Sequence, residues 1–73
     1  MFRDNILGKR IAGLRSEFHL TQDQFGEVFG YVRNAVSHIE RGDRLVSIEK
    51  LVEIAVYFDV STDYLLGLKE EKK

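Results

Sequence analysis

Five hydrogen-bonding side chains fall on one face of a short predicted helix near the middle of this 73-residue chain. Their spacing of i, i+1, i+4, i+5 and i+8 places them on one side of a helix, and they are Arg33, Asn34, Ser37, His38 and Arg41. Asparagine can bond to adenine, and arginine can bond to guanine or to phosphate. The same residue types on a helix surface are ordinarily solvated, so their role depends on the segments that position them.

Residues 21–42 predict two short helices joined by a tight turn. Thr21 can cap the first helix, and Gln24 follows three residues later, which is the spacing of a capping box. Gly30 is suited to a left-handed helix stop, and the second helical pattern ends at Gly42. Helices this short do not stand alone in water. The pair is therefore interpreted as a helix-turn-helix, whose second helix can enter a DNA major groove.

Apolar residues of this segment predict how its two helices pack. Those expected to point into the angle between the helices are Phe25, Phe29, Tyr31, Val36 and Ile39. Gly26 lies inside the first helix, where glycine costs about 1 kcal/mol relative to alanine. We expect the second helix to approach Gly26 closely enough to exclude a larger side chain.

The flanking sequence predicts three scaffold helices. A first helix over about residues 4–17 has one apolar face, formed by Leu7, Ile11, Leu14 and Phe18. Ser47 can cap a fourth helix, whose core stripe is Leu51, Ile54, Ala55 and Phe58. Ser61 can cap a short fifth helix that stops at Gly67.

The whole pattern resembles the Cro/repressor-type helix-turn-helix family, also called the xenobiotic-response-element family. The residues that carry the resemblance are Leu20, Thr21, Gln22, Phe25, Gly26, Phe29, Gly30, Val36, Ser37 and the run from Ile39 to Gly42, and it continues through residues 47–67. It implies an all-α, compact five-helix, lambda-repressor-like DNA-binding domain over residues 1–68, with the helix-turn-helix formed by helices 2 and 3. Two residues depart from the family pattern: Val32 replaces a small polar cap, and Val46 replaces a common proline.

The resemblance also implies roles for single residues. Residues expected at base edges or nearby phosphates are Arg33, Asn34, Ser37 and His38, and residues expected at phosphates are Gln22, Arg41 and Arg44. The family commonly pairs an arginine of the first helix with a glutamate that ends the recognition helix. We therefore expect a partly buried Arg15–Glu40 ion pair. For the proposed DNA contacts, the alternative is that Arg33, Arg41 and Arg44 are ordinary surface charges.

Apolar residues outside the expected core predict an interface between two subunits. The fourth and fifth helices have more apolar surface than a small monomer core needs, and we expect the interface at Val56, Tyr57, Tyr64 and Leu68. The alternative is that these residues are scattered exposed apolar side chains, as on most proteins. The motif typically reads a near-palindromic operator as a homodimer.

Charge and composition narrow the function further. Residues 1–44 have seven Lys/Arg and six Asp/Glu, whereas residues 45–73 have four and six, giving a net charge of −1 for the chain. This weak basic bias predicts few phosphate contacts per subunit. The charged tail, residues 69–73, is expected to fray. The chain has no cysteine, no long apolar run and no signal-peptide pattern, so a cytoplasmic protein without membrane contact is expected.

No residue arrangement indicates an enzyme. No nucleophile stands beside a base, and no glycine-rich phosphate loop occurs. His19 and His38 lack ligand-spaced partners, so neither a metal site nor a cofactor is expected. Two function classes stay open: a sequence-specific regulator of transcription, most simply a repressor, that binds double-stranded DNA, and a protein-interaction module such as an antitoxin or anti-repressor subunit.

Overall fold

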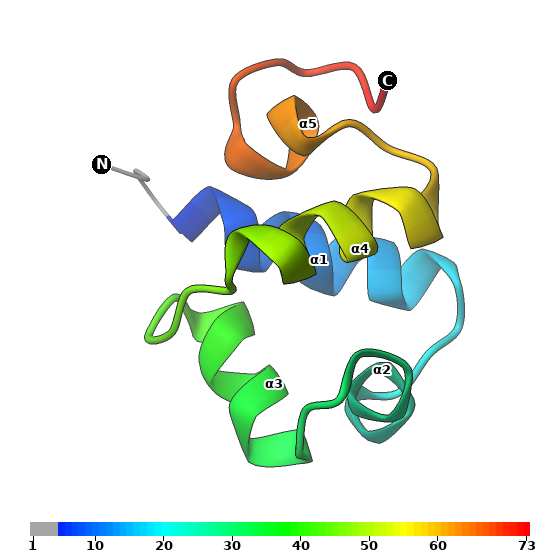
Figure 1. The fold of residues 1–73 in the computed structure, drawn as a ribbon, viewed down its shortest axis with the longest axis vertical. Helices are drawn as coiled ribbons and strands as arrows, with labels where there is room; N and C mark the ends of the chain where they lie inside the picture. The colour runs from blue at the N-terminus through cyan, green and yellow to red at the C-terminus, as the bar shows by residue number, and fades with distance from the viewer. Residues whose placement is uncertain (1–4) are drawn as a thin grey trace.

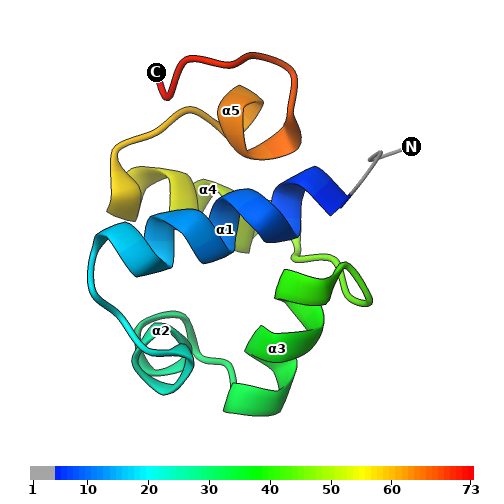
Figure 2. The same ribbon diagram turned by 180° about the vertical axis from the view of Figure 1, so that it is seen from behind.

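The computed structural model describes residues 5–73, and within this range it contains five α-helices and no strands. The helices are α1 (Ile6–Glu17), α2 (Gln22–Phe29), α3 (Arg33–Arg41), α4 (Ile48–Phe58) and α5 (Thr62–Leu66). The pair α2–α3 lies on one side of α1 and α4, and α5 lies on the other side (Figures 1 and 2). The expected all-α, five-helix architecture is confirmed. None of the helices in residues 5–73 is long and apolar enough to cross a membrane.

Local capping signals define most helix ends. The capping box of α2 is formed, because Thr21 Oγ1 accepts from the Gln24 amide at 3.1 Å and the Thr21 amide donates to Gln24 Oε1 at 2.8 Å. Ser47 and Ser61 accept from backbone amides three residues later and cap α4 and α5. The glycines that end α2, α3 and α5 all have positive φ, and they are Gly30, Gly42 and Gly67. These expected boundaries are confirmed.

The first helix differs from expectation at both ends. It begins at Ile6, after Asn5 in a left-handed backbone conformation, and residue 4 lies outside the described residues. At the other end, Phe18 was expected on the buried face, but its side chain is 45% exposed. The chain leaves the helix at this point: the Phe18 amide bonds to Leu14 O, and the next residue, His19, has φ 58°. The Phe18 ring therefore packs edge-on against Phe58, 4.8 Å between centroids, from outside the core.

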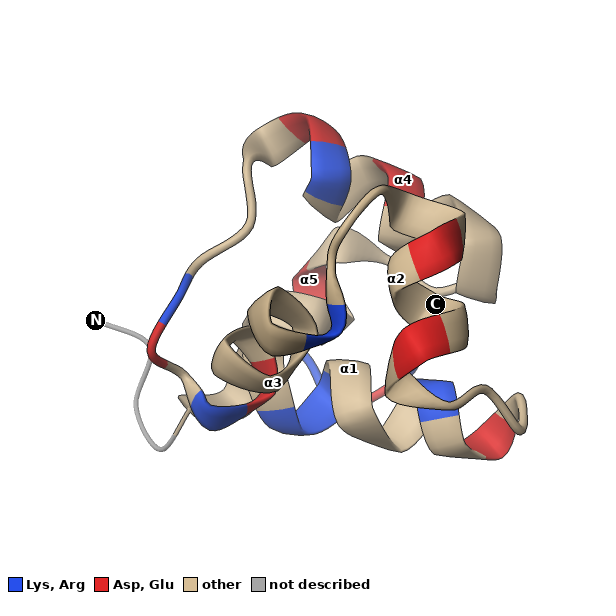
Figure 3. Ribbon diagram, turned by 90° about the horizontal axis from the view of Figure 1, so that it is seen from below, with Lys and Arg blue, Asp and Glu red and all other residues tan. Residues whose placement is uncertain are grey.

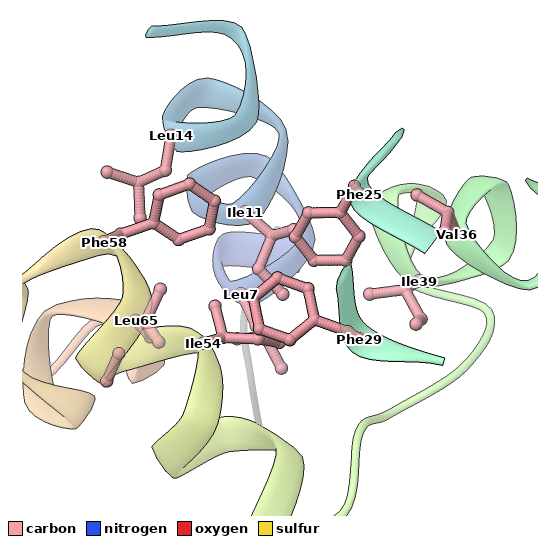
Figure 4. Packing of buried hydrophobic residues seen from close by; sticks show 11 residues of the cluster. Leu7, Ile11, Leu14, Phe25, Phe29, Val36, Ile39, Ile54, Phe58 and Leu65 are labelled. Atoms are coloured by element: carbon pink, nitrogen blue, oxygen red, sulfur yellow. The ribbon is translucent and has the colours of Figure 1, made fainter. Parts of the chain in front are cut away.

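All five helices contribute to one hydrophobic core (Figure 4). Its buried members are Leu7, Ile11, Leu14, Phe25, Phe29, Val36, Ile39, Ile54, Ala55, Phe58 and Leu65. Tyr31 and Leu51, which were expected to be buried, are partly buried and pack against this cluster. Because α2 and α3 each place their apolar residues in the shared core, the two short helices are stabilised by packing rather than by their own length.

Gly26 is confined by the turn between α2 and α3, and not by α3 itself. A Cβ atom at this position would collide with the carbonyl oxygen of Tyr31, whereas the nearest side-chain atom of α3, Val36 Cγ2, would lie at an ordinary 3.6 Å. The expectation of a close approach at Gly26 is right, but the expected neighbour is wrong. The turn carbonyl is the group that excludes a side chain here.

A C-terminal strap, residues 68–73, folds back over α1. Arg10, whose side chain is only 13% exposed, donates through Nη1 to Tyr64 O at 2.5 Å and to Lys69 O at 2.8 Å. Its guanidinium carbon also lies 4.2 Å from the centre of the Tyr64 ring. Further along, the Lys72 ammonium lies 2.8 Å from Glu17 Oε1. The strap is also attached near its end, because the Ser61 amide donates to Lys72 O at 2.6 Å and Lys73 Nζ lies 2.7 Å from Asp59 Oδ2. Whether the tail frays concerns motion and stays a prediction.

Candidate nucleic-acid interface

The recognition-helix candidate α3 has a buried face and a polar outward face. Its buried face is formed by Ala35, Val36 and Ile39. On the other side, Arg33, Asn34 and Arg41 are exposed, while Ser37 and His38 are partly exposed. Viewed from the side of α2 and α3, basic positions lie towards both ends of α3 and acidic positions lie on α2 (Figure 3). The structure thus brings together the five residues that the helical spacing predicted.

The start of α3 has no side-chain cap. Val32 occupies the N-cap position with an extended backbone, φ −75° and ψ 157°, and α3 begins at Arg33. The Val32 side chain is 73% exposed and offers no acceptor to the first turn. The amides of the first helical turn are therefore open to an external acceptor.

Two contacts from α1 hold the end of α3. Arg15 Nε donates to Glu40 Oε2 at 2.6 Å and Arg15 Nη2 donates to Glu40 Oε1 at 3.1 Å, so the pair is bidentate. The two side chains are 19% and 10% exposed. At the other end of α1, Asn5 Nδ2 donates to Glu40 O at 2.7 Å. Because both contacts converge on one residue, Glu40 connects α3 rigidly to α1.

Gln22 joins this ion pair as well. Its side-chain Nε2 donates to Glu40 Oε1 at 3.1 Å, so one amide hydrogen is already used inside the protein. A hollow of about 350 Å³ lies beside it, lined by Arg15, Thr21, Gln22, Asp23 and Arg33. This hollow lies between the first turns of α2 and α3, where basic side chains and backbone amides could receive an anion.

The C-terminal half of α3 and the residue Asp43 beyond it form a network that the sequence did not predict, centred on Arg41. Arg41 Nε lies 3.3 Å from Asp43 Oδ2, and Arg41 Nη2 lies 3.0 Å from His38 Nδ1. Arg41 Nη1 points to Ser37 Oγ at 3.5 Å, near the limit of a hydrogen bond. Each terminal nitrogen of Arg41 keeps a second N–H.

Arg44 lies over the turn between α2 and α3. Its guanidinium carbon is 5.3 Å from the centre of the Tyr31 ring. Burial raises the pKa of Tyr31 above its ordinary value, partly offset by Arg44 and then by Lys50. The Tyr31 hydroxyl therefore remains neutral at physiological pH and can donate a hydrogen bond. Lys50, on the first turn of α4, was not predicted as part of this site. Its position beside Tyr31 depends on the loop between α3 and α4.

Comparison with known proteins agrees with this geometry. A family model described as helix-turn-helix matches residues 11–65 of the chain. The chain belongs to the helix-turn-helix family. This match, together with the structural similarity to the P22 c2 repressor reported below, confirms the resemblance to Cro/repressor-type proteins that the sequence motifs indicated.

Several members of the helix-turn-helix family are similar over most of this chain. The HTH-type transcriptional regulator ImmR of Bacillus subtilis is 36% identical over 67 residues, which are 92% of this chain and 53% of that protein. The chain spans about half the length of this and similar curated relatives. The P22 c2 repressor, solved in complex with a synthetic operator, is 28% identical with a TM-score of 0.74, over 82% of this chain and 91% of that chain. The restriction-modification controller protein C.AhdI from Aeromonas hydrophila is 30% identical with a TM-score of 0.71, over 85% of this chain and 96% of that chain.

This helix-turn-helix protein also has an exposed apolar surface on α4. Ile48, Val52 and Val56 are 81%, 48% and 75% exposed. They are spaced i, i+4 and i+8, so they form one line along the helix, and we call them the α4 stripe. An apolar hollow of about 220 Å³ adjoins it, lined by Leu7, Leu45, Val46, Ile48, Leu51 and Leu66.

The four residues expected at a subunit interface are in different surroundings. Val56 belongs to the α4 stripe, and Leu68 is 71% exposed. Tyr57 turns away from the stripe and packs edge-on against Phe29, 5.4 Å between ring centroids. Tyr64 is partly covered by the Arg10 guanidinium. The sequence missed Ile48 because it begins the helix and belongs to no repeated core position.

Proposed function

We propose that this helix-turn-helix protein binds a specific double-stranded DNA sequence in the cytoplasm and regulates transcription, as a repressor that acts as a homodimer. The observation that carries the proposal is the polar outward face of α3, held by a buried inner face and by the bidentate Arg15–Glu40 pair. A helix held this firmly can place its side chains against base edges at little entropic cost. The operator-bound P22 c2 repressor, to which the fold is similar, supports the same reading.

The two halves of α3 have different proposed roles. Arg33 and Asn34 are exposed on the first turn and have no side-chain partner in the described residues, so they are free to bond to guanine and adenine. Ser37 and His38, one turn later, would contact base edges or adjacent phosphates. Base contacts of this kind specify sequence, whereas phosphate contacts set position.

The phosphate contacts are proposed at both sides of α3. Gln22 keeps a free side-chain oxygen and one free amide hydrogen, and it borders the hollow between α2 and α3. Arg41 at the end of α3 would contact phosphate too. Arg44 and Lys50, which lie beside Tyr31 in the turn before α3, are further candidates for phosphate contacts. Asp23 and Asp43 stand among these cations, which limits non-specific attraction to DNA.

The weak basic bias favours two subunits on one operator. We place the contact between the subunits on the α4 stripe, which ends at Val56, and on Leu68. Leu68 lies two residues after Leu66, which lines the apolar hollow beside the stripe. The rings of Tyr57 and Tyr64 already pack within the subunit, so they would add less. Recognition helices in such a dimer would lie about 34 Å apart, one turn of DNA. In sedimentation, Val52→Asp should give a monomer, whereas Val28→Asp, a similarly exposed valine on α2, should not.

Selection of bound sites from random DNA tests the function directly. The wild-type protein should enrich a near-palindromic sequence. Asn34→Ala should weaken binding to that sequence by about 1–3 kcal/mol and relax one base position, with little change on random DNA. If no sequence is enriched, the chain is not a sequence-specific DNA reader, and the protein-interaction module becomes the better hypothesis.

A further inference from the structure

We infer that Arg41 sets the tautomer of His38, so that His38 presents an N–H donor to DNA, and that removing Arg41 would reverse this polarity. The effect on base choice rests on the proposed DNA binding, whereas the tautomer itself follows from contacts within the free protein. The tautomer decides which bases His38 can bond to. Residue identity alone leaves this open, because a neutral imidazole has one donor and one acceptor nitrogen.

Two neighbours compete for the same nitrogen of His38. Arg41 Nη2 lies 3.0 Å from Nδ1, and Asp43 Oδ2 lies 3.4 Å from Nδ1. An arginine nitrogen can only donate, and a carboxylate oxygen can only accept. In the neutral ring, Nδ1 can therefore satisfy one of these neighbours and not both.

The distances favour the bond from Arg41. A separation of 3.0 Å is ordinary for a hydrogen bond, whereas 3.4 Å exceeds the usual range for N–H···O. Asp43 also has another partner, because Arg41 Nε lies 3.3 Å from the same carboxylate oxygen. Nδ1 accordingly accepts from Arg41, and the ring hydrogen lies on Nε2. Asp43 acts as a positioning residue that holds the guanidinium beside the ring.

The tautomer determines which bases fit. With its hydrogen on Nε2, His38 donates to base acceptors in the major groove, which are O6 and N7 of guanine, N7 of adenine and O4 of thymine. The cytosine amino group, a donor, is then disfavoured at the same position. His38 is thus a specificity-determining residue whose preference is set by Arg41, one helical turn away.

Nuclear magnetic resonance of the free protein tests the tautomer without DNA. Nitrogen-15 correlation spectra at about pH 8.5, above the usual imidazole range, report which ring nitrogen carries the hydrogen. The wild type should show Nε2–H at His38. In Arg41→Met, only Asp43 remains beside Nδ1, and the ring should switch to Nδ1–H. In Arg41→Met/Asp43→Ala, both neighbours are gone and the ring should show a mixture.

Controls separate the switch from general disturbance. His19, the other histidine, should keep the same spectrum in every variant, and circular dichroism should show unchanged helix because Arg41 is exposed. An identical His38 tautomer in the wild type and in Arg41→Met would overturn the inference.

Site selection supplies the second readout. Loss of a phosphate contact weakens all sequences alike, but the tautomer switch should change one base. At the position that His38 reads, the wild type should disfavour cytosine about tenfold, and Arg41→Met, in which His38 presents an acceptor, should favour cytosine. If the wild type selects a site and the base preference is the same in Arg41→Met, the inference fails while the proposed function stands. If the wild type selects no site, the proposed function fails, and the tautomer spectra still decide the geometry.

Discussion

Two of the arginine–carboxylate pairs in residues 5–73 have the same chemistry but opposite surroundings. Arg15 and Glu40 are 19% and 10% exposed and bond bidentately, with a shortest distance of 2.6 Å. Arg41 and Asp43 are both 57% exposed and approach only to 3.3 Å. A pair withdrawn from water is costly to break, because one charge would be stranded. An exposed pair exchanges partners cheaply, so the first pair is suited to holding α3 and the second to meeting a ligand.

The largest expected effect is the loss of the buried partner. Glu40→Ala strands the Arg15 guanidinium and also removes the acceptor for Gln22. We expect a loss of about 3 kcal/mol in the free energy of unfolding, measured by urea or thermal denaturation. Glu27→Ala, an exposed glutamate on α2, is the matched control and should change stability by less than about 0.5 kcal/mol. Equal stability of the two variants would show that burial does not distinguish the pairs.

The next effect concerns Arg10, which is partly buried and bonds mainly to backbone. Arg10→Met leaves the Lys69 carbonyl without its donor and removes one of the two donors of the Tyr64 carbonyl, which keeps the Gly67 amide. Hydrogen bonds to a charged group contribute about 1.5–3 kcal/mol. We expect a loss of about 2 kcal/mol and faster hydrogen exchange in the C-terminal strap. Lys9→Met, the exposed cation beside it on α1, should change neither quantity. If the strap amides exchange as fast in the wild type as in Arg10→Met, Arg10 does not anchor the strap.

A smaller effect is expected at the exposed cation Arg44, and in binding rather than stability. Arg44→Ala should weaken binding to the selected operator and to random DNA alike, and should reduce the slope of log affinity against log salt by about 1. Arg44→Lys keeps the charge and should retain most of that slope. A loss confined to the selected operator would instead assign Arg44 to base reading.

The smallest effect is expected at the exposed pair of Arg41 and Asp43. Asp43→Asn should leave the free energy of unfolding within about 0.5 kcal/mol of the wild type, because exposed ion pairs contribute little. Removing this negative charge beside the proposed phosphate contacts should raise affinity for random DNA about twofold to threefold at low salt. Asp63→Asn makes the same change of charge on α5 and should give a smaller rise. Destabilisation as large as that of Glu40→Ala would erase the difference between the two pairs.

Features of the fold that depend on neighbouring residues were predictable from the sequence. The Thr21–Gln24 capping box and the Ser47 and Ser61 caps are set within a few residues, so their spacing predicted the helix starts. Periodicity failed at Phe18, where the chain leaves the helix through a turn that the apolar spacing does not encode. For Gly26 the sequence predicted crowding, but the crowding atom belongs to a backbone carbonyl, which no residue type identifies.

The candidate site divides in the same way. The outward face of α3 follows from helical spacing, and the Arg15–Glu40 pair follows from the family resemblance. Asp43 was missed because it reaches back to Arg41 and His38 only after the left-handed turn at Gly42. The contact between Arg10 and Lys69 was missed because it joins a side chain to a main-chain oxygen far along the chain, which leaves no pattern in residue types.

The C-terminal strap also decides where attachments to this domain would project. Its hydrogen bonds to Arg10 and its ion pairs with Glu17 and Asp59 bring Lys73 to the side of α5, away from α3 (Figures 1 and 2). A dye, an affinity tag or a fused protein joined at Lys73 would project from the face opposite the recognition helix. In the proposed complex with DNA, such cargo would stay clear of the groove that α3 enters.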